Sequence, residues 1–386
     1  MYQPSYYDNF KCIGSKCPNS CCIGWSIDLD LETFRKYKEL KDPEFEKNIS
    51  LNPFCSNDKF GTIKIDKDKR CSFLDKDNLC NIQKHHTKDL LAPICASFPR
   101  KRIEFGKKEI SSCLLSCPEI SRMIFDDKEP LRILNKKKKI VYGDFKIIPD
   151  ELRSNIYAVK GEKVFNLLYQ LYNDENISLE VCLSVTNQII NENFNNAKSL
   201  EEIEKTFDYI KDFFINFKFT KTPETDSQIE FSKIFFENFL NKNLKNKLCD
   251  LIKKIYKKNY IEKNKNELRL VFERAKLQKY NKFISTFTYL DKKYFLHELF
   301  SNINIFTNED FNAKEKFYVI FLISLLTKLI LIFNAIDRDT ITKKDFIEVI
   351  SLVSRYYGGR EEFDDDDKKI LLNQETFTNF FHLFFN

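Results

Sequence analysis

The run Cys12-Ile-Gly-Ser-Lys-Cys17-Pro-Asn-Ser-Cys21-Cys22 decides how the first third of this chain can fold. Ten of the twelve cysteines lie between residues 12 and 117, whereas only Cys182 and Cys249 fall in the rest of the chain. Such crowding of thiols indicates either a set of disulfides or a metal site. Residues 1–8 lack the basic and apolar regions of a secretory signal, so we expect a reducing, cytoplasmic location and favour metal over disulfides.

Length and composition indicate a globular protein with two domains. The chain has 386 residues, of which 42% are hydrophobic and 31% are charged, and this excludes wholesale disorder. Its formal charge of +6, from 63 Lys and Arg against 57 Asp and Glu, is too small to indicate binding of nucleic acid. The uneven spread of cysteines predicts a cysteine-cluster metal-binding domain over residues 1–135 and a helical domain over residues 136–386. The basic run at 136–139 is interpreted as a solvated connector.

The first domain is predicted to be α+β, with short elements, because a metal can replace part of a hydrophobic core. Residues 27–40 show helical periodicity. Residues 61–66 alternate with a period of two and predict a strand, with residues 103–105 and Ile110 as its expected partners. Cys117-Pro118-Glu119 predicts the start of a helix, since Pro suits the first helical position and Glu the first turn.

The second domain is predicted to be an all-α bundle. Val164, Leu167, Leu168 and Leu171 recur at the spacing of one helix face, and residues 231–239 repeat that pattern. Strand signals are nearly absent after Glu151. We therefore expect roughly eight to ten helices here and a chain that is predominantly α.

One segment, residues 317–335, is apolar and long enough to raise the question of a membrane span, which needs about 20 apolar residues. Lys328 lies near its middle, where a charged side chain costs roughly 3 kcal/mol on insertion scales. We expect a buried central helix of the bundle rather than a stable membrane span. Peripheral association with a membrane stays open.

Four segments carry a specific order of cysteines and neighbouring aromatics. They are residues 6–25, from Tyr6-Tyr7-Asp8-Asn9-Phe10 to Trp25; residues 70–83, around Cys71 and Cys80; residues 95–100, Cys95-Ala-Ser-Phe98-Pro99-Arg100; and residues 116–122, Ser116-Cys117-Pro118-Glu119-Ile-Ser-Arg122. In this order they resemble the flagellin lysine-N-methylase (FliB) family, and the cysteine pattern is similar to the wider group of zinc- or iron-chelating cysteine-cluster domains. The helical remainder resembles the family only in character.

The resemblance implies a protein-lysine N-methyltransferase. It implies transfer of methyl groups from S-adenosylmethionine to surface lysines of flagellin, in the cytosol, with an iron–sulfur cluster held by the cysteines. We expect a 4Fe-4S cluster, with zinc as the alternative. The candidate metal ligands in the matched segments are Cys12, Cys17, Cys21, Cys22, Cys71, Cys80, Cys95 and Cys117. Cys55 lies outside these segments and is expected to be structural, and Cys113 is left unassigned. His85 and His86 offer nitrogen ligands, although we interpret them as a surface pair.

The number of thiols exceeds what one metal needs. A tetrahedral zinc or a cubane takes about four thiolates, and adjacent cysteines such as Cys21 and Cys22 seldom serve one tetrahedral ion. The spacing Cys17-x3-Cys21-Cys22 also differs from the C-x3-C-x2-C run of radical S-adenosylmethionine enzymes, and no G-x-G-x-x-G follows a strand. A cluster with three cysteine ligands could chelate the amino and carboxylate groups of the cofactor, whereas one with four would be structural or a redox switch. How the cofactor binds stays open.

Methyl transfer needs more than metal, because a lysine of pKa about 10.4 must lose its proton before it attacks a sulfonium. Tyr6, Tyr7 and Trp25 could form an aromatic wall for an alkylammonium, but we favour packing around the metal as their role. The carboxylates nearest the thiols in sequence are those of Asp28, Asp30 and Glu119. None is assigned as a base, and the catalytic and cofactor-binding residues are left unknown.

Two further classes of function fit the same residues. A non-catalytic metal or iron–sulfur carrier would bind metal reversibly without methyl transfer. A protein-interaction module would use the cysteines only as a structural metal site and would hold flagellin or another partner with the helical bundle.

Overall fold

The computed structural model describes residues 2–24, 27–52, 56–57, 59–105, 108–135, 146–147, 156–192, 197–217, 225–242, 246–306 and 313–357. The chain packs into two units. Unit 1 comprises Met1–Glu104, Lys108–Ile120 and Ile133–Pro149, and unit 2 comprises Phe105–Lys107, Ser121–Arg132 and Asp150–Asn386. The predicted fold class is confirmed: a mixed α/β region precedes a mainly helical one. The domain boundary after residue 135 stays a prediction.

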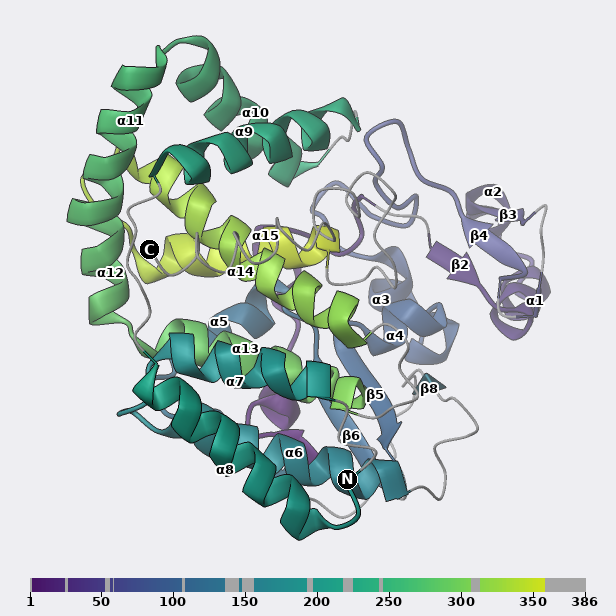
Figure 1. The fold of residues 1–386 in the computed structure, drawn as a ribbon. Helices are drawn as coiled ribbons and strands as arrows, with labels where there is room; N and C mark the ends of the chain where they lie inside the picture. The colour runs from purple at the N-terminus through teal and green to yellow at the C-terminus, as the bar shows by residue number, and fades with distance from the viewer. Residues whose placement is uncertain are drawn as a thin grey trace. The chain divides into compact units, whose positions relative to one another are not determined.

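Unit 1 contains two small sheets (Figure 1). The five-stranded sheet has the order β7-β1-β6-β5-β8, and the three-stranded sheet has the order β2-β4-β3. The strands are β1 Tyr2–Pro4, β2 Ile27–Leu29, β3 Ile49–Leu51, β4 Gly61–Ile63, β5 Arg100–Phe105, β6 Lys108–Cys113, β7 Ile133–Asn135 and β8 Lys146–Ile147. The helices near them in sequence are α1 Leu31–Glu39, α2 Pro43–Asn48, α3 Asn81–His85, α4 Pro93–Ser97 and α5 Pro118–Asp126.

Two predictions about unit 1 are wrong in part. Residues 27–29 form strand β2 rather than the start of a helix, and the helix begins only after Asp30, whose carboxylate accepts a hydrogen bond of 2.8 Å from the Thr33 N–H. Strand β4 exists as predicted, but it pairs with β2 and β3, as in Ile27 opposite Ile63, and not with residues 103–105. A period of two identifies a strand but not its partner. The helix predicted to begin at Pro118 is confirmed as α5.

Aromatic rings form the core of unit 1. Tyr37, Phe45 and Phe73 are each at most 1% exposed, and the Phe45 ring lies 4.6 Å from the Tyr37 ring and 5.0 Å from the Phe73 ring, centre to centre. The Tyr37 hydroxyl donates to the Leu90 carbonyl at 2.5 Å. The elements are short, as predicted, yet the unit still buries a hydrophobic core of its own.

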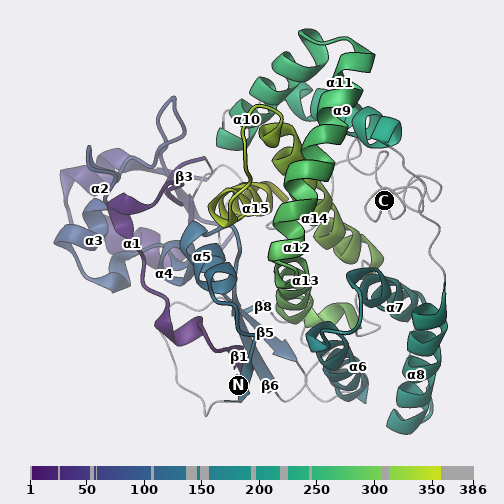
Figure 2. The same ribbon diagram turned by 90° about the vertical axis from the view of Figure 1, so that its left-hand side faces the viewer.

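Unit 2 has ten α-helices among its described residues beyond 155, within the range predicted. They are α6 Ile156–Asn173, α7 Leu179–Glu192, α8 Leu200–Asn216, α9 Thr225–Asn241, α10 Lys247–Tyr256, α11 Lys265–Arg274, α12 Asn281–Thr286, α13 Tyr289–Ser301, α14 Ala313–Ala335 and α15 Lys343–Tyr357. A π-helical turn, Ala275–Tyr280, joins α11 to α12, so that the three form one continuous rod in both views (Figures 1 and 2).

Helix α14 contains the apolar segment that raised the question of a membrane span. Among the described residues it is the one helix long and apolar enough to cross a bilayer, with a mean hydropathy of 2.2. In the structure 78% of its apolar window is buried. The Phe333 ring, for example, packs 5.0 Å from Phe272 and 5.8 Å from Phe236. The helix is therefore buried within unit 2, as expected.

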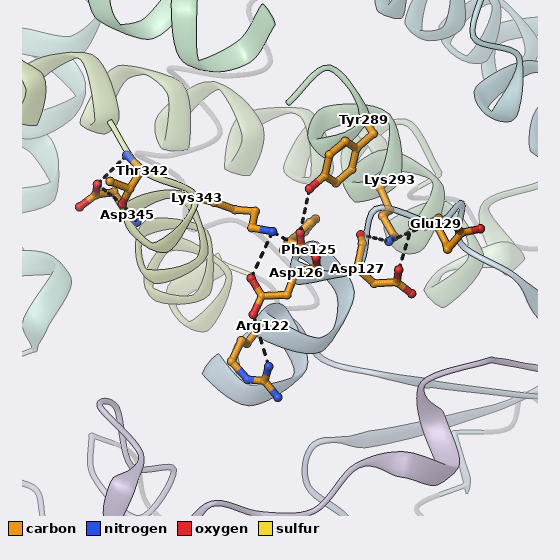
Figure 3. A network of polar contacts seen from close by, with 10 residues as sticks. All are labelled: Arg122, Phe125, Asp126, Asp127, Glu129, Tyr289, Lys293, Thr342, Lys343 and Asp345. Atoms are coloured by element: carbon orange, nitrogen blue, oxygen red, sulfur yellow. Dashed lines mark hydrogen bonds and ion pairs between the residues drawn. The ribbon is translucent and has the colours of Figure 1, made fainter. Parts of the chain in front are cut away.

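The end of α5 is held inside unit 2 by two lysines (Figure 3). Lys293 on α13 donates to the carbonyl oxygens of Asp127 and Glu129, both at 2.7 Å. Lys343 on α15 donates to the Asp126 carbonyl at 3.1 Å and lies 3.4 Å from the Asp126 carboxylate. The residues after the last turn of α5 are thus fixed by α13 and α15.

Lys328 of α14 is a buried cation. Its Nζ lies 5.6 Å from the centre of the Tyr280 ring. The pKa of Lys328 is lowered to about 8, mainly by burial and in part by Lys276, while Asp291 on α13 acts in the opposite direction. Burial in turn raises the pKa of Asp291 to about 6, with Lys328 opposing the shift. The two groups partly compensate each other's loss of hydration.

Lys328 is expected to make stability depend on pH. The unfolded chain keeps this proton up to a pKa of about 10.4, so between pH 8 and about 10.4 the folded protein binds fewer protons than the unfolded one, and stability rises with pH. At about 1.4 kcal/mol per pKa unit, the gain is at most about 3 kcal/mol. In urea unfolding from pH 7 to 10, the free energy of unfolding of wild type should rise relative to that of Lys328→Met. It should not rise relative to that of the control Lys344→Met, whose lysine is exposed. A wild-type-to-variant difference that is constant with pH would contradict this.

Candidate metal centre

Four cysteines gather on the core of unit 1, and we call them the core thiols: Cys22, Cys71, Cys80 and Cys95. Cys71 is part of the buried core, and the other three pack against it. The backbone brings them together from separate segments. The Cys71 N–H donates to the Cys22 carbonyl at 2.9 Å, Cys80 forms a β-bridge with Leu74, and Cys95 lies in α4.

The core thiols act on one another electrostatically. The pKa of Cys71 is raised to about 12, mainly by burial and in part by Cys22 and Cys80, against a backbone hydrogen bond from Phe73 that lowers it. Burial also raises the pKa of Cys95, and Cys22, Cys71 and Cys80 add to that shift. Without a cation these sulfurs stay protonated, because thiolates so placed would repel each other in a poorly hydrated site. A bound metal would reverse this, since it removes the thiol proton.

Three other cysteines form a second set, the outer thiols Cys12, Cys17 and Cys117. The pKa of Cys117 is raised to about 11, mainly by burial and in part by Cys17 and Cys12, against N–H groups at the start of α5 that lower it. Cys12 is exposed, and its sulfur accepts the Gly14 N–H at 3.4 Å. Gly14 has a φ of +56°, a backbone conformation that favours glycine.

Cys21 lies between the two sets. Its pKa is raised strongly by a hydrogen bond with Cys22 and by burial, and further by the charges of Cys22, Cys95 and Cys12. Within the part of the chain that the structure describes, no three Cys, His, Asp or Glu side chains are placed to hold a single ion. The thiols are therefore gathered without being arranged around one ion. As soft ligands they suit zinc or an iron–sulfur cluster, and the eight predicted ligands stay a prediction.

The aromatic residues near the thiols pack inside unit 1. Tyr6 and Tyr7 are 7% and 3% exposed. The guanidinium of Arg100 lies 5.6 Å from the centre of the Tyr7 ring and 5.2 Å from that of Phe10. This arrangement agrees with packing rather than with a wall open to a substrate. Trp25 lies outside the described residues.

The remaining candidates have structural surroundings. The His86 ring meets the Phe45 ring edge-on at 5.1 Å, so this histidine packs on the aromatic core. Asp30 caps α1, as described above. Cys113 is fully buried in β6, whereas Cys55 lies outside the described residues.

The division of the thiols into two sets is what sequence reasoning missed. Cys21 and Cys22 are adjacent, yet Cys22 packs on the core of unit 1 as one of the core thiols, whereas the pKa of Cys21 is also raised by Cys12, an outer thiol. Spacing along the chain carries no signal for this, because the partners of each thiol come from distant segments. The contact of Arg100 with two aromatic rings was likewise not predicted, although Arg100 lies in the matched segment 95–100.

Comparisons with known proteins place the chain. No family model matches it, and no solved structure matches it. Over 140 residues it is 34% identical to the flagellar biosynthetic protein FliU of Salmonella muenchen, a match that covers 35% of this chain and 82% of that protein. The chain belongs to the FliU family.

This FliU-family chain is also a distant homologue of lysine-N-methylases. It is 30% identical over 187 residues to the lysine-N-methylases of Salmonella choleraesuis (strain SC-B67) and Salmonella typhimurium (strain LT2). Each match covers 47% of this chain but 44% of the methylase. The aligned part of the chain thus covers less than half the length of these methylases.

Proposed function

We propose that this chain transfers methyl groups from S-adenosylmethionine to lysine side chains of flagellin in the cytosol. The observation that carries the proposal is the similarity to two lysine-N-methylases, which indicates a methyltransferase. The FliU relative is described as a flagellar biosynthetic protein, and this supports flagellin as the proposed substrate. Neither nucleic acid nor a membrane-spanning role enters the proposal.

The reaction can be written with its electrons balanced. The substrate lysine first loses a proton, to a base or to solvent, because only the neutral amine has a lone pair to donate. Its nitrogen then forms a bond to the methyl carbon while the carbon–sulfur bond of the sulfonium breaks. The electron pair of that bond stays on sulfur, giving S-adenosylhomocysteine and methyl-lysine. No side chain of this chain is assigned as the base.

The thiols are the residues that would hold the iron–sulfur cluster that we propose, with zinc as the alternative. The core thiols and outer thiols supply soft sulfur ligands, and burial of Cys71 keeps water away from such a site. When bound, a cluster supplies positive charge that holds these sulfurs as thiolates. Its content of iron and sulfide separates it from zinc.

The test is methyl transfer by the full chain. Protein reconstituted anaerobically with iron and sulfide is incubated with flagellin and with S-adenosylmethionine labelled in its methyl group. We expect methyl-lysine in flagellin peptides by mass spectrometry, and loss of the label when S-adenosylhomocysteine is added in excess. Iron-loaded protein that binds S-adenosylmethionine but leaves flagellin unmodified would refute the proposal.

One observation favours a second function, that of a non-catalytic iron–sulfur carrier. Cys12 is exposed while the core thiols are buried or half-buried, which would suit handing metal to another protein. Transfer of iron and sulfide to an acceptor apoprotein, without any methyl-lysine, would support the carrier. Tight binding of flagellin with neither activity would instead support an interaction module with a structural metal.

A further inference from the structure

The five-stranded sheet of unit 1 carries a row of polar side chains, the sheet row, made of Gln3, Ser111 and Arg102. Parallel pairing of β1 with β6, with Tyr2 beside Ile110, brings Gln3 beside Ser111. The hydrogen bond from the Leu114 N–H to the Pro99 carbonyl, 2.8 Å long, sets the antiparallel register of β6 with β5. That register puts Arg102 directly across from Ser111, on the same face of the sheet.

A carboxylate joins the sheet row. Glu109 precedes Ser111 by two residues in β6 and therefore shares its face. Its Oε1 lies 3.4 Å from Nη1 of Arg102, and the two side chains are only 16% and 12% exposed. Arg102 and Glu109 thus place one positive and one negative charge beside the uncharged members of the row.

The neutral members of the row are buried without partners. Gln3 and Ser111 are both 0% exposed. Within the described part of the chain, neither the amide nitrogen nor the amide oxygen of Gln3 makes a hydrogen bond, and neither does the Ser111 hydroxyl. Each such group costs about 1–3 kcal/mol, which is why buried polar atoms in native proteins nearly always have a partner. Three unpartnered atoms beside one ion pair indicate a site that a ligand or bound water completes.

We propose that the sheet row and Glu109 bind the amino-acid end of an α-amino-acid ligand. Under the proposed function, on which this inference rests, that ligand is the methionyl end of S-adenosylmethionine. The Arg102 guanidinium matches an α-carboxylate, and the Glu109 carboxylate matches an α-ammonium. The Gln3 amide and the Ser111 hydroxyl donate to the remaining carboxylate lone pairs. A phosphate would be repelled by Glu109 and a simple cation by Arg102, so the charges select a zwitterion.

The experiment compares two ligands that differ in this end alone. S-adenosylhomocysteine carries the amino-acid group, and 5′-methylthioadenosine lacks it. Titration calorimetry on the full, iron-loaded chain should show tighter binding of S-adenosylhomocysteine. Arg102→Gln should weaken S-adenosylhomocysteine by about 30- to 100-fold, as expected for a lost charged hydrogen bond, and leave methylthioadenosine unchanged. Arg35→Gln, at an exposed position on α1, is the matched control and should change neither.

A second variant keeps the test valid if Arg102→Gln fails to fold. Ser111→Ala removes a hydroxyl that makes no hydrogen bond in the protein alone, so the unliganded protein should be as stable as wild type or more so. The same change should weaken S-adenosylhomocysteine by about 3- to 10-fold. Stability retained together with affinity lost is the signature of a ligand-binding hydroxyl rather than of a structural one.

The outcomes separate this inference from the proposed function. Wild-type protein that binds both ligands equally, or variants that bind S-adenosylhomocysteine as wild type does, would overturn the sheet-row site even if flagellin is methylated. Bound water alone would then complete the row. Selective weakening in the variants together with unmodified flagellin would support the site and refute the methyl transfer.

Discussion

Cys95→Ser is expected to remove most of the iron from the protein and to abolish methyl transfer to flagellin. Cys95 packs with Cys22, Cys71 and Cys80 on the core of unit 1, and its pKa responds to all three. Serine keeps the volume of the side chain but replaces a soft ligand with a weak one. We expect the same loss for Cys71→Ser and Cys80→Ser, measured as iron and sulfide per chain and as methyl-lysine formed.

The matched control is Cys182→Ser. Cys182 is fully buried in unit 2, where its thiol donates to the Leu171 carbonyl at 3.7 Å, a bond that a serine hydroxyl can replace. Iron content and activity should stay near those of wild type. Full activity in iron-free Cys95→Ser protein would show that the cluster takes no part in the reaction.

The variants also test whether the thiols form one site or two. If the core thiols and the outer thiols hold separate metals, each variant should lose only the iron of its own site. Cys17→Ser and Cys117→Ser should then lose the iron of the outer site, and a core-thiol variant should lose the iron of the core site. If Cys21 and the outer thiols complete a single site with the core thiols, every variant should lose the same iron. Cys12→Ser and Cys22→Ser distinguish the sets in the same way.

Phe45→Ala is expected to destabilise unit 1 by about 3–5 kcal/mol, the usual cost of removing a buried aromatic ring. The Phe45 ring is 1% exposed and contacts Tyr37, Phe73 and His86. Deleting it leaves a cavity in the core against which the core thiols pack, so metal binding should weaken as well. Urea unfolding of the metal-free protein, followed by circular dichroism, measures the change.

The control for this substitution is Phe217→Ala at the end of α8. Phe217 is 48% exposed, so truncation there should cost less than about 1 kcal/mol. A similarly small loss for Phe45→Ala would mean that metal, and not the ring cluster, holds unit 1 together. A metal that replaces part of the hydrophobic core was the reason to expect short elements in this domain.

Local signals in the sequence were sufficient for parts of the fold. Pro118 and Glu119 marked the start of α5, and the central Lys328 indicated a helix buried in the bundle, as α14 is. Both signals act within a few residues of the element they describe. The helical character of unit 2 followed from periodicity for the same reason.

Features that depend on distant pairing were not predicted. Ile27–Leu29 has a pattern compatible with a helix and becomes a strand only because β4 pairs with it. The sheet row forms because strand β1 pairs in parallel with β6, and no motif near Gln3 predicts this pairing. For the candidate site, the crowding of thiols is visible in the sequence and their role as ligands stays a prediction, whereas their division into core and outer thiols could not be predicted.

Helix α5 starts in unit 1 directly after Cys117 and ends in unit 2, where Lys293 and Lys343 hold Asp126 and the residues that follow. The chain therefore enters unit 2, leaves it and returns. A chimaera of two relatives joined after residue 135 would combine the α5 of one parent with the α13 and α15 of the other. Successful recombination must preserve the fit of α5 to these helices, which couples the evolution of the cysteine-rich third to that of the helical bundle.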